Sequence, residues 1–416
     1  MSGSLGAARA ISIRPSRAEH NRLLSDTAAR LAARGLIHLT AEDHVNDGRH
    51  VRLGGRDLLN FGSCSYLGLE VDERLKDAAC DAIRRYGVQF SSSRAYVSTP
   101  LYAEFEALLE QIFAAPVVVA QTTSLGHLAT LPVVVGEHDA VLYDVLVHAS
   151  VQAVLPTLRA AGTPCTQVPH SRVERLDALL TELGKHHEKV WYLCDGIYSM
   201  HGDRAPLAEL FQLQERHPAL HLYIDDAHGM SWTGRHGAGT VLGFGPMRPR
   251  MVVALGLSKA FAAAGAAFVF SDLDTRRLVR SCGSTLIFSG PLQPGQIGAG
   301  IASARLHLSG ELQDLQLLLS RRIELFNELS IDSGLRLRDR SLSPVRFIEI
   351  GAEEQALDRA SDLAAAGFFT NLSVFPAVPR RRAGLRVMLT THHGEEDVQR
   401  LVQALGTGPQ RISHIR

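Results

Sequence analysis

Short apolar runs alternate with helix-length amphipathic segments through the middle of this chain. The runs cover residues 117–120, 140–143, 166–168, 190–194, 220–224, 251–255, 267–270 and 286–288. Helical patterns, for instance 151–161 and 173–183, lie between most of them. A short run without a polar side is typical of a strand buried on both faces of a parallel sheet. The alternation therefore predicts an α/β fold with a doubly wound, mostly parallel sheet.

The chain has 416 residues, more than one simple core holds, so two domains around one site are expected. We predict a lead-in over residues 1–60, a large domain over 61–294 and a smaller C-terminal α/β domain over 295–416. The lead-in contains a helical pattern at 16–34 and a hairpin at 50–59 that turns at Gly54-Gly55. In the remainder we predict a long helix from Pro294 to about Leu329, strands at 345–350, 368–375 and 385–389, and helices at 354–365 and 395–405.

Composition excludes several classes of function. The formal net charge is zero and 21% of residues are charged, which does not favour a nucleic-acid or membrane-surface partner. The five cysteines are widely spaced and include no Cys-x-x-Cys pair, so neither a disulfide framework nor a bound metal is expected. The sequence has no signal-peptide pattern and no apolar run that could span a bilayer, so we expect a cytoplasmic protein.

Lys259 stands between the apolar run 251–257 and the small residues 260–267. This places it just past the end of a buried strand, where open α/β sheets bind their ligands. A desolvated lysine has a lowered pKa, and its neutral amine is a nucleophile for a carbonyl cofactor. We therefore predict that Lys259 carries pyridoxal phosphate (PLP), although a lone lysine is more often a surface charge.

Two further groups follow buried runs. Asp225 comes directly after the run 220–224 and could keep a pyridine nitrogen protonated, with His228 within reach of the ring's phenolic oxygen. The alternative is that Asp225 and its neighbour only cap a helix. His148 follows another strand and could stack on a cofactor ring, or it could be an ordinary hydrogen-bonded core histidine.

The remaining candidates would bind charged groups. The turn 121–126 ends a strand and begins a helix, so its backbone N–H groups could hold a phosphate or could form an ordinary cap. Arg386 lies on an apolar strand, where it could bind a carboxylate or make a structural salt bridge. The serine-rich loop 87–99 is expected to line a polar space.

Together these pieces resemble the α-oxoamine synthases, a family of fold-type I PLP enzymes. The resemblance runs from about Leu58 to Leu405, in the family's order. It rests on Asn60-Phe61 with Tyr66–Leu69, His148–Ser150, Asp195–Asp203 with Ala205–Leu207, Asp225–Gly229, Lys259, Phe288-Ser289, and Leu385-Arg386 with Thr390 and His393. Such an ordered set is specific for the family and much less specific for the substrate.

The resemblance implies a role for each motif. Lys259 would bind the cofactor and move the substrate's α-proton. Around the ring, Asp225 would pair with the pyridine nitrogen, His148 would stack on the ring face, and Ser199 and His228 would contact the ring oxygen. Backbone groups of Thr123 and Ser124 would bind the phosphate, and Arg386 would bind the amino-acid carboxylate. Members are dimers with active sites at the interface. Ser289 of one subunit would therefore reach the phosphate in the other.

Some positions depart from the family's pattern. Cys64 stands where the family has a substrate-contacting asparagine, and Arg94 lies in a loop that is bulkier than the usual glycine-rich one, so both are candidate substrate contacts. Ser124, Gly256 and Gly290 replace residues of the phosphate site, and two hydroxyl groups are thereby lost. The hydroxyls of Ser124, Ser258 and Ser289 could replace them.

The function implied is condensation of a small amino acid with an acyl thioester, either acyl-CoA or an acyl carrier protein, with loss of carbon dioxide to give an α-amino ketone. A second enzymatic interpretation is another fold-type I reaction, such as aldol-type cleavage of a β-hydroxy amino acid. A third is an idle partner subunit, which the presence of Lys259 disfavours.

Overall fold

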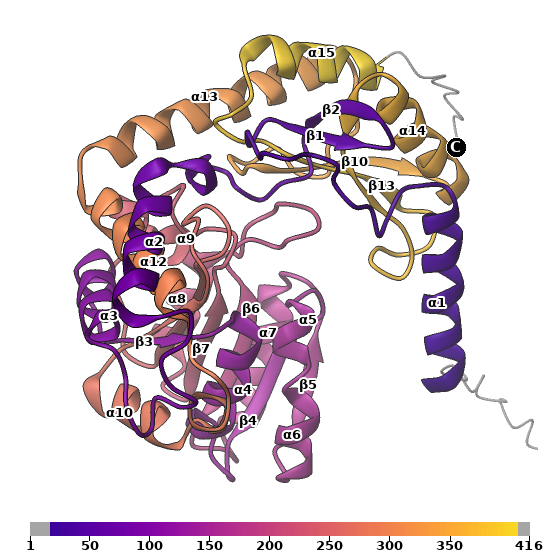
Figure 1. Cartoon of the computed structure of the whole chain (residues 1–416). Coiled ribbons are helices and arrows are strands. Elements are labelled where there is room, and N and C mark those ends of the chain that lie inside the picture. Colours follow the sequence, from indigo (N-terminus) through magenta and orange to yellow (C-terminus); the bar gives the residue numbers. More distant parts are fainter. Residues whose placement is uncertain (1–16, 407–416) are drawn as a thin grey trace, which may run out of the picture.

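Seven strands form one sheet at the centre of the larger part of the molecule (Figure 1). The computed structural model describes residues 17–406. The strands are β3 (Val117–Ala120), β4 (Ala140–Asp144), β5 (Cys165–Val168), β6 (Val190–Asp195), β7 (Leu220–Asp225), β8 (Met251–Gly256) and β9 (Ala266–Phe270), in the spatial order β3-β9-β8-β7-β6-β4-β5. Six of the strands run in one direction and β9, between β3 and β8, runs in the opposite one. The prediction of a mostly parallel sheet is confirmed.

Apart from the edge strand β5, the strands are buried on both faces, which is why their residues are mostly apolar. In β3, Val117 and Val119 contribute to one core while Val118 and Ala120 contribute to the other. One core is completed by α3 (Pro100–Phe113), α7 (Val173–Leu183), α8 (Leu207–Arg216) and α12 (Pro294–Leu308). The other is completed by α4 (Thr123–Val134), α5 (Ala149–Gln152), α6 (Leu155–Ala160) and α10 (Leu273–Cys282). The sheet is therefore doubly wound, as predicted.

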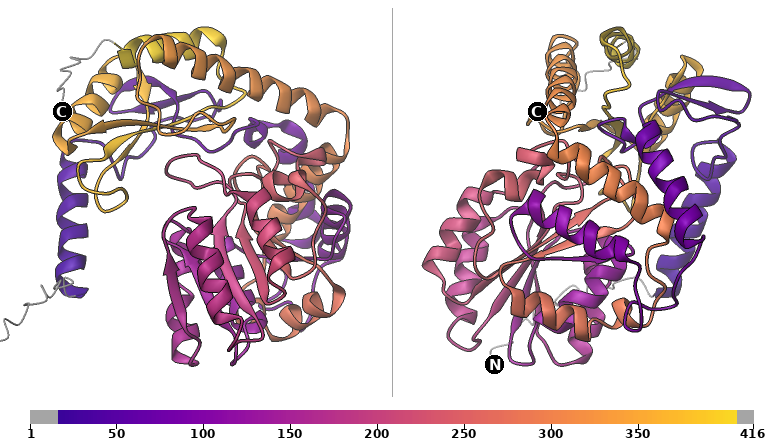
Figure 2. Two further views of the ribbon diagram at one scale, coloured as in Figure 1. Left: turned by 180° about the vertical axis from the view of Figure 1, so that it is seen from behind. Right: turned by 60° about the vertical axis from the view of Figure 1, so that its left-hand side comes forward.

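The smaller part contains two three-stranded sheets (Figure 2). One is built from β10 (Val345–Gly351), β13 (Ala383–Met388) and β12 (Asn371–Ser373), and the other from β1 (His50–Leu53), β2 (Arg56–Asn60) and β11 (Phe368–Phe369). The helices of this part are α13 (Glu311–Asp332), α14 (Glu353–Ala365) and α15 (Glu395–Gly406). The predicted hairpin is present and pairs with β11, while α12 packs on α2 (Glu73–Tyr86) and α3. The three-part division at residues 60 and 294 stays a prediction.

Three secondary-structure predictions were wrong. Residues 286–288 do not form a strand, because Ser284–Ile287 closes a helical turn, α11, in which the Phe288 N–H bonds to the Ser284 carbonyl. The long helix after Pro294 is two helices, since Ser309 and Gly310 separate α12 from α13. The strand at 368–375 breaks at Thr370, because Phe369 pairs with β2 whereas Asn371 pairs with β13.

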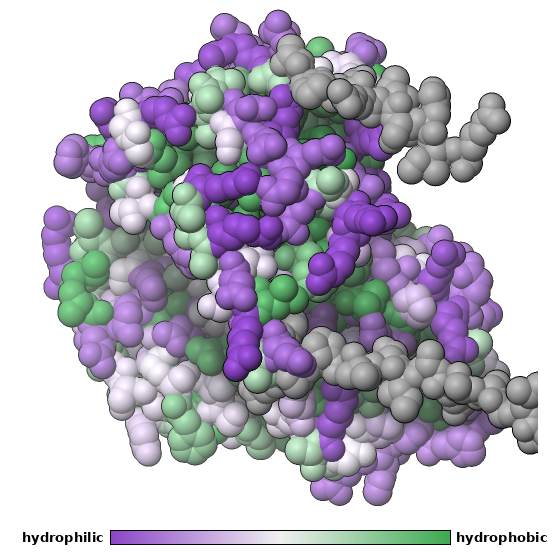
Figure 3. All heavy atoms as spheres, turned by 90° about the vertical axis from the view of Figure 1, so that its right-hand side faces the viewer, coloured by the Kyte–Doolittle hydropathy of each residue, from purple (hydrophilic) through white to green (hydrophobic). Residues whose placement is uncertain are grey.

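Helix α1 (Arg17–Ala33) lies at one side of the molecule, as predicted for 16–34 (Figure 1). Arg34, just past its end, forms ion pairs with Glu354 and Asp358 of α14. Hydrophilic side chains predominate on the face that bears α1, with apolar ones in patches between them (Figure 3). Within residues 17–406 no helix is both long and apolar enough to cross a membrane. The remaining helical segments are α9 (Gly239–Phe244) and the 3-10 turns Leu69–Val71 and Arg235–Gly237.

Candidate active site

The carboxyl ends of β6, β7 and β8 meet at one edge of the sheet. Asp195 and Asp225 end two neighbouring strands and face each other in register. Lys259 follows β8 after two residues and is half-buried. The charges of Lys259 and His148 both act on Asp225, and Asp225 in turn acts on Asp195. These four residues therefore form one electrostatic cluster. The structure thus brings together residues that lie more than 100 positions apart in the sequence.

Asp225 is a buried carboxylate with a partner on each oxygen. Its Oδ1 accepts a hydrogen bond from the Ala227 N–H at 3.0 Å, and its Oδ2 lies 3.0 Å from Nε2 of His127. Burial alone would raise the pKa of Asp225, but the hydrogen bond and charge of His127, with Lys259 and His148, lower it to about 2. Asp225 is therefore an anion at neutral pH, as a partner of a protonated pyridine ring must be.

The two predicted histidines are held in different ways. His148 caps α5, its Nδ1 lies 2.6 Å from Ser150 Oγ, and its backbone N–H donates to Asp195. His228 is buried, and its Nδ1 lies 2.7 Å from the Tyr66 hydroxyl. Burial lowers the pKa of both imidazoles, and the charge of Lys259 lowers both further. Both rings are accordingly neutral near pH 7, which suits stacking and hydrogen bonding.

Arg386 presents an unpaired edge of its guanidinium group. Its Nη1 donates to the Ser199 carbonyl at 3.1 Å, so the structure places these two predicted residues side by side. Its Nε is buried and has no hydrogen-bond partner among residues 17–406, and no carboxylate of that range forms an ion pair with it. The cluster also includes Cys64, which contacts Tyr66. A free guanidinium edge here is what an incoming carboxylate requires.

The predicted phosphate-binding residues lie in the first turn of α4. Thr122 caps this helix by accepting a hydrogen bond from the Leu125 N–H at 3.1 Å, and Thr123 and Ser124 follow it. A helix start offers N–H groups and a favourable dipole to an anion. The Thr285 hydroxyl donates to the Leu125 carbonyl, while Ser289 donates to the Thr285 carbonyl. The Ser289 segment therefore packs beside this turn within one chain.

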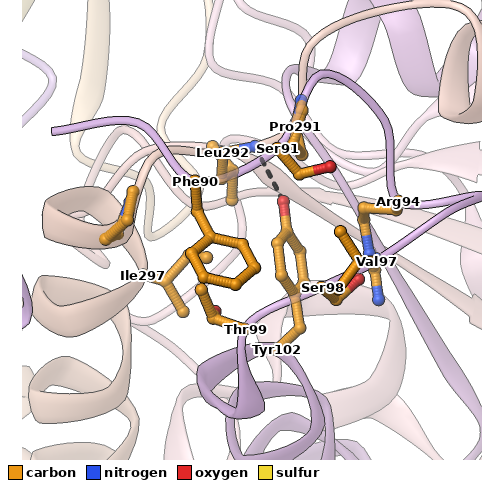
Figure 4. A pocket seen from close by; sticks show the side chains of 11 residues that line it. Phe90, Ser91, Arg94, Val97, Ser98, Thr99, Tyr102, Pro291, Leu292 and Ile297 are labelled. Carbon is orange, nitrogen blue, oxygen red and sulfur yellow. Dashed lines mark hydrogen bonds between the residues drawn. The ribbon is translucent and has the colours of Figure 1, made fainter. Parts of the chain in front are cut away.

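Arg94 is held away from the cluster. Its guanidinium pairs with Glu106 at 3.0 Å, donates to the Val119 carbonyl at 3.1 Å and stacks 3.7 Å above the ring of Tyr102 (Figure 4). The pocket beside it is lined by Phe90 and other residues of the serine-rich loop, and at about 10 Å³ it has room for one water molecule. None of these contacts is with the residues around Asp225, so substrate binding by Arg94 stays a prediction.

The structure adds three residues to which the sequence analysis assigned no role. They are His127 behind Asp225, Tyr66 beside His228, and Asp195 beneath His148. Tyr66 and Asp195 stand within the family motifs, which could have drawn attention to them. His127 lies one helical turn after Thr123 on α4, so its position facing the sheet could have been read from helical spacing.

Comparisons with known proteins agree with this geometry. The family model described as aminotransferase class I and II matches residues 56–405. An 8-amino-7-oxononanoate synthase from Maricaulis maris is 33% identical over 386 residues, which cover 92% of this chain and 95% of that protein. The enzyme of the same name from Symbiobacterium thermophilum is 30% identical, over 85% of this chain and 88% of that protein.

Solved structures share the fold. Serine palmitoyltransferase from S. paucimobilis, in a structure with a bound PLP–myriocin aldimine, superposes with a TM-score of 0.85 at 22% identity, over 94% of this chain and 98% of that one. An 8-amino-7-oxononanoate synthase from Francisella tularensis gives a TM-score of 0.71 at 20% identity, over 84% and 97% of the two chains. The predicted fold-type I architecture is confirmed.

The fold and the site define a fold-type I PLP-dependent enzyme. The chain belongs to the aminotransferase class I and II family and, within it, to the α-oxoamine synthases. The predictions of the family, of the cofactor and of a PLP-dependent C-acyltransferase are thereby confirmed. The residues present fit the cofactor, since the cluster offers a buried anion for the ring, an amine for its carbonyl and helix-start N–H groups for its phosphate.

Proposed function

We propose that this enzyme condenses a small α-amino acid with an acyl thioester, releasing the thiol and carbon dioxide and forming an α-amino ketone. The observation that carries the proposal is the unpaired guanidinium edge of Arg386 beside the Asp225 and Lys259 cluster. It provides a carboxylate site next to the amine that would hold the cofactor. The relatives' name, 8-amino-7-oxononanoate synthase, supports a condensing enzyme over other fold-type I reactions.

In this proposal each residue acts on a defined group. Lys259 holds the cofactor through its amine and later takes the proton from the substrate's α-carbon. Asp225, as an anion, would keep the ring nitrogen protonated, and His148, being neutral, would stack on the ring. Bound PLP supplies an electron sink for the charge that develops at the α-carbon.

Substrate orientation would fall to Arg386, Ser199 and Cys64. Arg386 binds the carboxylate of the amino acid through its free edge, while its Nη1 stays on the Ser199 carbonyl. Cys64 lies beside Tyr66 and is partly buried, and in this proposal it contacts the substrate. The α-carbon would then bond to the acyl carbonyl carbon as the thiolate leaves. Loss of the carboxylate as carbon dioxide would leave an electron pair at the α-carbon, which would take back the proton held by Lys259.

The site would be completed by a second copy of this chain. Two large apolar side chains of this region are unusually exposed, Phe288 at 85% and Tyr96 at 88%. Their segments are linked, because the Ser93 hydroxyl donates to the Ile287 carbonyl. The segment that bears Phe288 packs beside the start of α4 within the same chain, so a second copy seated on these exposed side chains would cover this end of the site.

The test is release of free thiol. The purified chain with PLP is given glycine, alanine or serine in turn, together with an acyl-CoA or an acylated carrier protein, and thiol and carbon dioxide are both measured. The proposal expects equal amounts of the two with one amino acid and neither with Lys259→Ala. Cleavage of a β-hydroxy amino acid without any thioester would contradict it.

A further inference from the structure

His127 and Tyr223 form a buried chain of hydrogen bonds behind Asp225. Nε2 of His127 lies 3.0 Å from Oδ2 of Asp225, and its Nδ1 lies 2.7 Å from the Tyr223 hydroxyl. Neither His127 nor Tyr223 has any exposed surface. The pair belongs to α4 and β7, so it joins the helix that starts at the phosphate-binding turn to the strand that carries Asp225.

The partners fix the direction of these hydrogen bonds. A carboxylate only accepts, so Nε2 of His127 must carry a proton and donate it to Asp225. The Tyr223 hydroxyl has no other hydrogen-bond partner in the described part of the chain, and burial raises its pKa well above the usual range. It therefore stays a phenol at neutral pH. The imidazole is held between its two neighbours, with Nε2 toward the carboxylate and Nδ1 toward the phenol.

Packing holds the ring in this position. The edge of His127 meets Phe268 with ring centroids 5.6 Å apart and planes at 81°, and meets Tyr223 at 5.7 Å. The preceding residue is Gly126, whose absent side chain lets α4 approach β9. A Cβ there would lie 1.9 Å from Phe268. The close approach is thus a condition for the hydrogen bond to Asp225.

We infer that His127, set by Tyr223, is a positioning residue that keeps Asp225 aimed at the cofactor's ring nitrogen and keeps that nitrogen protonated. The inference rests on the proposed role of Asp225. His127 takes the place of a water molecule at Oδ2 of Asp225. The side of the carboxylate that faces away from His127 would then be left for the cofactor's ring nitrogen. Among the other charged or titratable groups that face Asp225, Asp195 ends β6, Lys259 follows β8, His148 caps α5, and Asp226 is the next residue along the chain.

The experiment uses the holoenzyme loaded with PLP that carries ¹⁵N at the ring nitrogen, and measures the ¹⁵N chemical shift and the dissociation constant of the cofactor. His127→Phe removes both ring nitrogens, whereas Tyr223→Phe removes a single oxygen. Both should move the shift toward that of unprotonated pyridine, His127→Phe by more. His127→Gln, which can still donate to Asp225, should restore part of the change.

Two comparisons separate the possible outcomes. His307→Phe is the matched control, because His307 is equally buried but lies outside this cluster, and it should leave the shift unchanged. An unchanged shift in both His127→Phe and Tyr223→Phe would overturn the inference. If His127→Phe does not fold, the result for Tyr223→Phe decides alone. If Asp225→Ala also leaves the shift unchanged, the proposed role of Asp225 fails as well.

Discussion

The two ends of the candidate site differ in how fully one chain builds them. At the ring end, Asp225 is buried and both of its oxygens have partners within the same chain. At the phosphate end, Ser124 is exposed and the adjacent Phe288 is almost fully so. The ring end is therefore fixed by the sheet itself, whereas the phosphate end consists of turns that a second copy would cover in the proposed dimer.

The largest expected effect is at the ring end. Asp225→Ala should lower kcat by about 1,000-fold, because the electron sink depends on a protonated ring nitrogen. Thiol release under saturating substrates measures it, with the exposed Asp274→Ala as the control. A loss of less than tenfold would show that Asp225 is not the partner of the ring.

The carboxylate site should give a smaller effect that falls mainly on KM. Arg386→Ala should raise KM for the amino acid on the order of 100-fold, since a charge-assisted contact is lost. Arg382→Ala is the matched control, because Arg382 is half-exposed and pairs with Glu349 on the surface. Equal KM values for the two variants would place the substrate carboxylate elsewhere.

The phosphate end should respond to loss of the second copy. Phe288→Asp should shift the protein toward monomers in light scattering and weaken PLP binding about tenfold, as a charge in an apolar interface is unfavourable. Val45→Asp, at another exposed apolar position, should change neither. A wild-type protein that is monomeric yet fully active would contradict the proposed interface.

The last prediction concerns the stability of the fold, not activity, and a buried histidine outside both ends. Burial lowers the pKa of His307 to about 4, below the ordinary value of 6.5. Between pH 6.5 and 4 the imidazole is therefore protonated in the unfolded chain but stays neutral in the folded chain. Its stabilising effect is present above pH 6.5 and is lost as pH falls toward 4, by about 3 kcal/mol in all. Urea unfolding of His307→Gln should therefore show a flatter dependence on pH in this window, with unchanged PLP binding. An identical slope would exclude this role for His307.

The sequence predicted most of the fold because the signals were local. The run 251–255 is apolar without interruption and 220–224 is interrupted only by His221, and each forms a buried strand. The failures were local too. Residues 286–288 are apolar for three positions only and close a helical turn. Ser309 ends a helix although the helical pattern continues beyond it.

The candidate site was predictable where a residue follows a strand, as with Asp225, His148 and Lys259. Contacts made across the fold were not. His127 meets Asp225 only because Gly126 lets α4 approach the sheet, and Arg94 turns to Glu106, twelve residues away on α3. Such pairings depend on packing between elements, which spacing in the sequence does not record.

The most direct test of the central claim is the visible absorption spectrum of the purified chain during titration with PLP, beside Lys259→Ala. The account predicts a visible band in the wild type that one small amino acid shifts. It predicts no such band in Lys259→Ala before the amino acid is added. A wild-type protein that stays colourless at saturating PLP would contradict the assignment of Lys259 and, with it, the proposed reaction.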